Sequence, residues 1–127
     1  MISYVTLGVS DLAAAKKFYC ELFADQGAKL VMDGERICFI GKSMAEQPLL
    51  AICTPFNGEP ASAGNGSMVA FGQSSKDAVD ALYKKALALG ASCAGAPGER
   101  IAKVFYGAYV KDADGNKLCF NHFIKTF

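Results

Sequence analysis

The chain repeats itself at a constant offset of 64 residues. Residues 5–27 align with residues 69–91. The identical pairs are Val5 and Val69, Gly8 and Gly72, Ser10 and Ser74, Ala14 and Ala78, Tyr19 and Tyr83, and Ala24 and Ala88. A period this long allows only two copies in 127 residues, so the repeating unit is a half-domain and not a solenoid repeat. We expect the two half-domains to pack together and to form a site between them.

The composition fits a single compact domain spanning residues 1–127. An apolar content of 52% is ample for one core. Thirteen basic and twelve acidic residues nearly cancel, and neither sign forms a long run. This removes the electrostatic footprint of a protein that binds nucleic acid or an anionic membrane. We therefore expect the partner to be a small molecule or a second copy of the chain.

Neither the N-terminus nor the cysteines indicate an exported protein. Residues 1–12 carry no basic region ahead of their apolar stretch, so they predict a first strand and not a signal peptide. No apolar run approaches the roughly 18 residues of a membrane-spanning helix. The five cysteines include no CxxC pair, which favours free thiols in a reducing compartment. We expect a cytoplasmic protein.

Each repeat predicts a strand, a helix and then a meander of three strands, of which only two can be assigned to residue ranges in the second repeat. In the first repeat Ser10 and Asp11 supply side-chain oxygens able to cap the helix, and Ser74 or Ser75 does so in the second. The expected strands span residues 3–9, 28–32, 37–41, 49–54, 68–73, 104–110 and 117–123, the helices 12–23 and 77–89, and the loops or turns 55–67, 95–100 and 112–116.

Three phrases of the sequence are typical of one known group of proteins. They are VTLGVSDL with a following FY pair near the start, GNGSMVAF at the first strand of the second repeat, and FYGAYVKDADGNKL near the end. Together with the duplicated βαβββ pattern, they resemble the vicinal oxygen chelate superfamily, which includes glyoxalase I, extradiol dioxygenases, methylmalonyl-CoA epimerase and bleomycin- or fosfomycin-resistance proteins. The resemblance covers essentially the whole chain.

This resemblance implies an α+β fold, in which two tandem βαβββ modules form a curled mixed sheet around a cavity. The first module would span about residues 1–55, the linker about 55–67, and the second module about 68–127. Homodimers are usual in the superfamily, so we expect a homodimer.

The metal-binding positions of the superfamily are altered in this chain. Its enzymes typically bind a divalent metal through a histidine on the first strand of a module and a carboxylate or amide on its last strand. The two histidine positions hold Tyr4 and Met68, the carboxylate position holds Cys119, and the remaining position falls near Leu50. These side chains are poor donors for Zn²⁺, Ni²⁺, Mg²⁺ or Fe²⁺. We predict no metal and no other cofactor, so the usual polarisation of a bidentate oxygen substrate has no electrophile.

Strand alternation groups the candidate ligand-binding residues. Val5 and Leu7 carry the bulk expected against a helix, which places their neighbours on the opposite, concave face, and the second repeat follows the same rule. His122, the only histidine, has the parity of the helix-facing residues. Arg36 or Arg100 can pair with a carboxylate or phosphate. The candidate ligand-binding residues are Tyr4, Thr6, Met68, Tyr106, Tyr109, Cys119, Asn121 and Arg100.

Three functions fit these observations. The first is a metal-free superfamily member that binds a small molecule in the cavity between its modules. The second is a divergent lyase or isomerase of the lactoylglutathione-lyase type that uses Cys119 or Tyr4 for proton transfer. An inert thiol is the simpler role for Cys119, because no histidine partner or basic motif adjoins it. The third is a dimeric scaffold with a filled cavity and no ligand.

Overall fold

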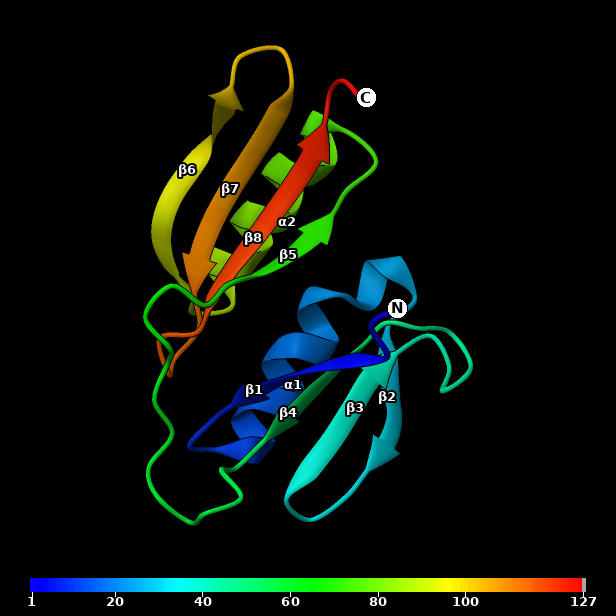
Figure 1. The fold of residues 1–127 in the computed structure, drawn as a ribbon, viewed down its shortest axis with the longest axis vertical. Helices are drawn as coiled ribbons and strands as arrows, with labels where there is room; N and C mark the ends of the chain where they lie inside the picture. Colours follow the sequence, from blue (N-terminus) through cyan, green and yellow to red (C-terminus); the bar gives the residue numbers. More distant parts are fainter. Residues whose placement is uncertain (127) are drawn as a thin grey trace. The chain divides into compact units, whose positions relative to one another are not determined.

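The computed structural model describes residues 1–126, and the chain divides into two compact units. Unit 1 spans Met1–Ser62 and unit 2 spans Ala63–Phe127, so the boundary falls inside the segment predicted as a linker. The predicted domain and its second module both end at Phe127, which lies outside the described residues. Each unit is an α+β module of one strand, an α-helix and three further strands, as the duplication predicts (Figure 1).

Unit 1 has a mixed four-stranded sheet in the order β1-β4-β3-β2. Its elements are β1 (Tyr4–Gly8), α1 (Leu12–Leu22), a short 3-10 helix (Ala24–Gln26), β2 (Lys29–Asp33), β3 (Ile37–Gly41) and β4 (Leu49–Cys53). The first strand runs parallel to the last, with Thr6 opposite Ala51, and the other neighbours are antiparallel. Tyr19 and Leu22 of α1 are buried in the core of the unit.

Unit 2 repeats this arrangement in the order β5-β8-β7-β6. Its elements are β5 (Val69–Gly72), α2 (Lys76–Ala88), β6 (Ser92–Ile101), β7 (Phe105–Lys111) and β8 (Lys117–Phe123). The parallel pair places Ala70 opposite Cys119. Figure 1 shows α2 lying behind β7 and β8, against which it packs. No helix within residues 1–126 has both the length and the apolar character needed to cross a membrane.

Equivalent residues of the repeat begin the two helices. The Asp11 carboxylate accepts a hydrogen bond of 3.0 Å from the Ala14 N–H, and the Ser75 hydroxyl accepts one of 3.0 Å from the Ala78 N–H. Of the alternatives that the sequence leaves open, the structure therefore selects Asp11 and Ser75 as the capping residues. Both satisfy a backbone donor of the first turn that has no partner within the helix.

The loop predicted at residues 95–100 is wrong, because these residues belong to the long edge strand β6. This strand pairs with β7 alone, and the pairing register shifts at several places between Cys93 and Ile101. Pro97 lacks a backbone N–H, but an edge strand has one side on which no donor is needed. The glycines and the proline that resemble a loop in the sequence are typical of bulges in an edge strand.

The predicted turn at residues 112–116 is confirmed, and a buried carboxylate holds it together. Asp112 Oδ1 accepts hydrogen bonds from the backbone N–H groups of Asp114 at 2.9 Å and Asn116 at 2.8 Å. Its other oxygen accepts a bond of 3.0 Å from the Asn116 side chain. Gly115 adopts the left-handed conformation that closes the turn, with a φ of 86°. The turn sets where β8 starts, and hence the side of the sheet that each of its residues faces.

We predict that Ser75→Ala lowers the free energy of unfolding by about 1 kcal/mol, because the capping bond to the Ala78 N–H is lost. Ser74→Ala is the matched control, since Ser74 is exposed and does not form this bond. Urea titration of both variants measures the difference. Equal destabilisation by the two substitutions would contradict the assignment of the cap.

Candidate functional site

The register of the unit 2 sheet divides its side chains between a helix side and an open side. Tyr106 marks the helix side, because its phenol donates a hydrogen bond of 2.5 Å to Oδ1 of Asp80 on α2. The residues that share this side by strand pairing are Val69, Phe71, Ala108, Val110, Leu118, Phe120 and His122. The alternate residues form the open side: Ala70, Gly72, Phe105, Gly107, Tyr109, Lys111, Lys117, Cys119, Asn121 and Phe123.

Two of the residues considered in the sequence end on the helix side. The structure does not bring Tyr106 together with the other candidate ligand-binding residues, because its strand position points toward α2. His122 lies opposite Tyr106, with its Nδ1 atom 3.0 Å from the carbonyl oxygen of Gln73. The parity predicted for the only histidine therefore agrees with the observed register.

Cys119 and Tyr109 form the centre of the open side. They lie opposite each other on β8 and β7, close enough for each group to affect the pKa of the other. Burial raises the pKa of the Cys119 thiol, although Tyr109, Lys117 and Arg100 act in the opposite direction. Burial also raises the pKa of Tyr109, and the neighbouring Cys119 adds to this effect. Both groups are therefore neutral near pH 7.

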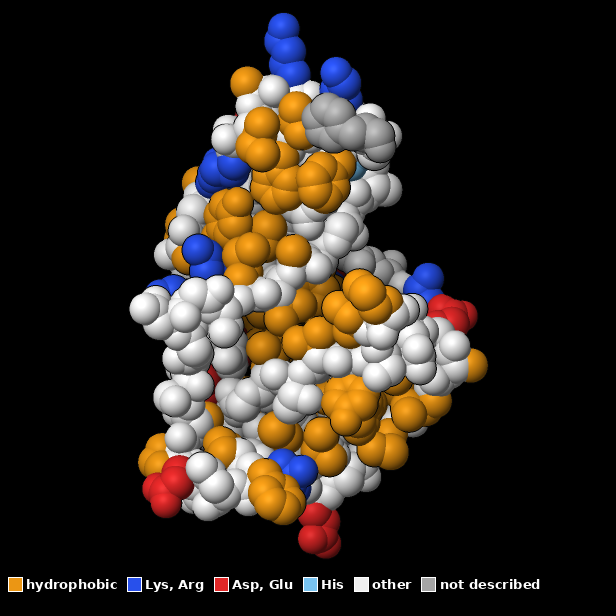
Figure 2. Space-filling model, viewed as in Figure 1, with side chains coloured by type: hydrophobic (Ala, Val, Ile, Leu, Met, Phe, Trp, Pro, Cys, Tyr) orange, Lys and Arg blue, Asp and Glu red, His pale blue; other side chains and the backbone are white. Residues whose placement is uncertain are grey.

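Two cations flank the Tyr109 ring. The Arg100 guanidinium carbon lies 5.3 Å from the ring centroid, and the Lys117 ammonium nitrogen lies 5.0 Å from it. Arg100 comes from β6 and Lys117 from β8, the two strands that border β7. Figure 2 shows apolar side chains gathered over the unit 2 sheet, with basic side chains at their margin. The open side thus combines an aromatic centre with two cations that lie against its ring, and Lys111, which pairs with Lys117, adds a third basic residue to this side.

Glycines make room for the Arg100 side chain. Its guanidinium donates a hydrogen bond to the carbonyl oxygen of Ala96. A Cβ atom added at Gly98 would come within 2.7 Å of Nη1 of Arg100, and one added at Gly95 within 3.2 Å of Nη2. Only a residue without a side chain leaves this space to the guanidinium. The segment GAPGER, which resembles a loop, is instead the support on which its own arginine lies.

Asn121 supplies a buried polar group next to empty space. The residue is 6% exposed, and its side-chain amide forms no hydrogen bond with another residue of the described range 1–126. Its strand neighbours on both sides are glycines, Gly72 on β5 and Gly107 on β7. A Cβ atom added at Gly72 would meet nothing within 4 Å. The amide therefore lies beside open space, where a ligand can reach it.

Unit 1 carries Tyr4 and Thr6 on the open side of its own sheet. Tyr4 is 48% exposed, and its ring packs edge-on against Phe39 with 4.9 Å between the centroids. Leu50 is not on this side, because it pairs with Val5, which has the opposite parity to Tyr4 and Thr6. The residue equivalent to Cys119 is Ala51, since Thr6 pairs with Ala51 as Ala70 pairs with Cys119.

Two further sequence candidates have simple structural surroundings. Met68 lies immediately before β5 and is 45% exposed. Arg36 donates a hydrogen bond of 3.0 Å to the carbonyl oxygen of Thr54, and its guanidinium lies 5.2 Å from the Phe56 ring centroid. Arg36 therefore ties the start of β3 to the segment after β4. Of the two arginines singled out in the sequence, only Arg100 belongs to the open side of unit 2.

The residues at the metal positions of the superfamily do not fit a divalent metal. Tyr4 offers a phenol, Met68 a thioether and Cys119 a thiol whose raised pKa keeps its proton. Neither the Leu50 side chain nor that of Ala51, the residue that strand pairing places at the position equivalent to Cys119, has a donor atom. Within residues 1–126 no three histidine, cysteine or acidic side chains come together as a possible metal site. A hard or borderline ion needs more donors, and better ones, than this set provides.

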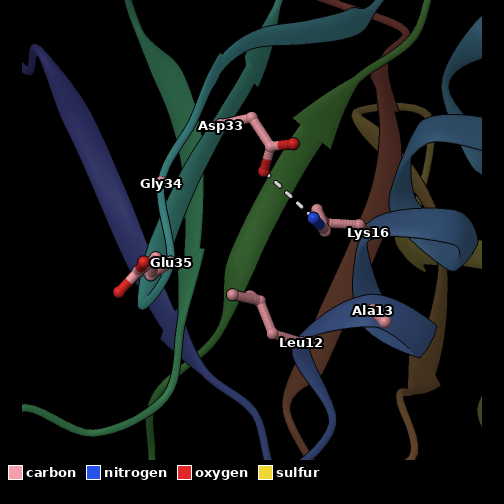
Figure 3. Close-up of a pocket in the computed structure, with 6 residues that line it drawn as sticks. All are labelled: Leu12, Ala13, Lys16, Asp33, Gly34 and Glu35. Carbon is pink, nitrogen blue, oxygen red and sulfur yellow. Dashed lines mark hydrogen bonds and ion pairs between the residues drawn. The ribbon is translucent and has the colours of Figure 1, made fainter.

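A separate open pocket of about 430 Å³ lies within unit 1 (Figure 3). It is lined by Leu12, Ala13, Lys16, Asp33, Gly34 and Glu35. The Lys16 ammonium and the Asp33 carboxylate form an ion pair of 3.0 Å across it. Both charges are thus already compensated by each other, and none of the candidate ligand-binding residues lies in this pocket.

Comparison with known proteins identifies the family. The sequence profile of the Glyoxalase/Bleomycin resistance protein/Dioxygenase superfamily matches residues 1–120. The chain belongs to this superfamily. No curated protein matches it in sequence. The resemblance of the three sequence phrases is thereby confirmed, and so is the predicted α+β fold of two tandem βαβββ modules.

Solved structures of superfamily proteins have the same fold. A glyoxalase/bleomycin resistance protein from Albidiferax ferrireducens T118 is 36% identical, with a TM-score of 0.83 over 96% of this chain and 98% of that one. A glyoxalase-related enzyme from Fulvimarina pelagi is 22% identical, with a TM-score of 0.76 over 96% and 87% of the two chains. A glyoxalase/bleomycin resistance protein/dioxygenase family enzyme from Burkholderia phytofirmans PsJN is 21% identical, with a TM-score of 0.76 over 95% and 97%.

Lys117 is the residue of the open side that sequence reasoning missed. The sequence shows no basic motif beside Cys119, yet the charges of Lys117 and Arg100 both lower the pKa of its thiol. Lys117 directly follows the DADGN turn. The neighbouring residues are explained by the turn, so nothing in the local sequence marks Lys117 as a site residue. Its parity with Cys119 and Asn121 along β8 is the pattern that identifies its side of the sheet.

We predict that Cys93 reacts with a thiol reagent much faster than Cys119 in the folded protein at pH 8. Cys93 is exposed, whereas Cys119 is buried and its raised pKa leaves little thiolate. Peptide mass spectrometry after timed labelling measures both rates, and urea-unfolded protein is the control in which both thiols react. Labelling of Cys119 as fast as Cys93 in the folded state would contradict the assignment.

The raised pKa of Cys119 also predicts a loss of stability in alkali. The folded state holds the thiol proton more tightly than the unfolded state, whose thiol titrates near the ordinary value of 9.0. The resulting stabilisation is complete below that pH and disappears as the pH rises through the folded-state value. Between pH 8 and 10.5 the unfolding free energy of the wild type should fall more than that of Cys119→Ala. Parallel pH profiles would contradict this coupling.

Proposed function

We propose that this superfamily member binds a small molecule on the open side of its unit 2 sheet, without a metal at the positions that the superfamily uses. The observation that carries the proposal is Asn121, which is 6% exposed and lies between Gly72 and Gly107 on the open side, with a side-chain amide that bonds to no other residue of the described range. Within residues 1–126 no fully buried side-chain nitrogen or oxygen lacks a hydrogen-bond partner, so the Asn121 amide is accessible from outside. A ligand in the open space over Gly72 can therefore bond to it.

The surroundings of Asn121 have the composition of a ligand site. Small-molecule sites are mostly apolar and aromatic, with a few polar groups that fix orientation. Here Phe105 and Phe123 pack edge-on with 5.2 Å between their centroids, and both belong to the open side. Tyr109 and Cys119 add neutral polar atoms. This mixture supports binding more than it supports a filled scaffold.

Chemistry by Cys119 receives less support than binding. A thiol becomes a nucleophile or base when a neighbouring group lowers its pKa, whereas burial raises the pKa of Cys119. The only histidine lies on the other side of the sheet, so it does not assist. A lyase or isomerase mechanism would need another group to move the proton.

We also infer that the protein forms a homodimer and acts in the cytoplasm. The dimer is the usual assembly of the superfamily that the chain belongs to. The compartment follows from the five cysteines without a CxxC pair, which favour a reducing environment.

The experiment is a fragment-binding screen of the wild type and of a variant in which a larger side chain fills the space over Gly72. We predict that ¹H–¹⁵N spectra of the wild type show fragments shifting the amide signals of β5, β7 and β8. Gly72→Phe should abolish these shifts, because its ring occupies the space in which no atom now lies within 4 Å of a Cβ. The matched control is Ala81→Leu, which adds bulk to an exposed position of α2 in the same unit.

The binding screen has clear outcomes. Fragments that bind the wild type and Ala81→Leu alike, but not Gly72→Phe, support a site over Gly72. If no member of the library shifts these strands, or if Gly72→Phe binds as the wild type does, the proposal fails. The spectrum of Gly72→Phe itself shows whether the variant is folded.

A further inference from the structure

We propose that the ligand carries an anionic oxygen group, a carboxylate or a phosphate, held by Arg100 and Lys117 at the edge of the Tyr109 ring. This inference rests on the proposed function, because it names the chemical class of the ligand for the same open side. It depends on a different set of contacts, those of the two cations, and so it can fail while the binding proposal holds.

Neither cation is neutralised by the protein. Within residues 1–126, neither Arg100 nor Lys117 forms an ion pair with a carboxylate. The acidic neighbour of Arg100 along the chain, Glu99, is occupied elsewhere: its carboxylate lies 3.3 Å from the Lys76 ammonium and accepts a bond from the Lys103 N–H. Because consecutive side chains of β6 point to opposite sides of the sheet, the Glu99 carboxylate lies away from the Arg100 guanidinium.

The two cations border the same aromatic ring. Both lie within 5.3 Å of the centroid of the same ring, although they come from different strands. Like charges on either side of one ring repel each other, and an anion at the edge of the ring that contacts both reduces this repulsion. A guanidinium matches a carboxylate or phosphate with two parallel N–H donors, and an ammonium adds a point charge.

The guanidinium is positioned rather than free. It bonds to the Ala96 carbonyl oxygen and occupies the space over Gly95 and Gly98. One bond to a carbonyl uses one of its five N–H donors, so donors are left for a ligand. An arginine that is already ordered loses less conformational entropy when it binds, which favours an anion at this place.

The neutral groups of the open side suit the rest of such a ligand. Tyr109 supplies an aromatic surface and Asn121 an amide with unused hydrogen-bonding capacity. The Cys119 thiol and the Tyr109 phenol are both protonated near pH 7, so neither adds a negative charge that would repel an anion. The site therefore favours a small acid with an apolar or aromatic body.

The experiment compares three probes of similar shape: benzoate, phenyl phosphate and the neutral benzamide. Titrations followed by ¹H–¹⁵N spectra give a Kd for each. We expect at least one of the two anions to bind about tenfold more tightly than benzamide, the gain expected for charge-assisted hydrogen bonds. The preference between benzoate and phenyl phosphate identifies the carboxylate or the phosphate as the group recognised.

Variants assign the effect to the two cations. Arg100→Gln and Lys117→Gln should each weaken binding of the preferred anion about tenfold and leave benzamide unchanged. Gly98→Ala keeps every charge but displaces the guanidinium, since the added Cβ would lie 2.7 Å from Nη1. The Gly98→Ala substitution should therefore weaken binding of the preferred anion as well. Lys84→Gln is the matched control, because it removes one positive charge from an exposed position of α2.

Each outcome decides between the proposals. Anion selectivity that Arg100→Gln and Lys117→Gln abolish, and Lys84→Gln preserves, supports the inference. If benzamide binds the open side as tightly as the anions, the anionic class is overturned while the binding function stands. If no probe shifts β7 or β8, and a broad fragment library also leaves them unchanged, both proposals are overturned.

Discussion

Strand pairing in the unit 2 sheet is the constraint on which the candidate site depends. The parallel pair of β5 with β8, and the antiparallel pair of β8 with β7, decide which side chains face α2 and which face away from it. A shift of one residue would exchange the two sets. Cys119, Asn121 and Lys117 share the open side only because the Asp112 turn starts β8 at the right residue.

Much of this arrangement follows from the sequence. The offset of 64 residues predicts two equivalent modules, and the alternation of bulky residues predicts which strand positions face a helix. The same alternation places Cys119 on the opposite side from His122, as the structure does. These predictions succeed because a period-2 pattern with one buried face fixes the parity of a strand.

The rest depends on contacts that a sequence does not display. Strand β6 was missed because bulges at an edge tolerate glycine and proline, which are otherwise typical of loops. Tyr106 and Tyr109 have opposite parity along β7, but the bond from Tyr106 to Asp80 is what shows which of the two faces α2. Arg100 and Lys117 lie in different segments of the sequence, one in the glycine-rich GAPGER segment and one after the DADGN turn. The order of the strands brings both of them to the Tyr109 ring. Charge convergence of this kind needs the fold.

In the proposed account, the protein is a superfamily scaffold with poor metal donors at the usual positions, which recognises its ligand by charge and shape. A crystal structure of the protein soaked with benzoate tests this account most directly. The account predicts the carboxylate between Arg100 and Lys117, with the ring over the open side near Tyr109 and Asn121. A benzoate bound away from both cations, with Arg100 and Lys117 unchanged, would contradict it.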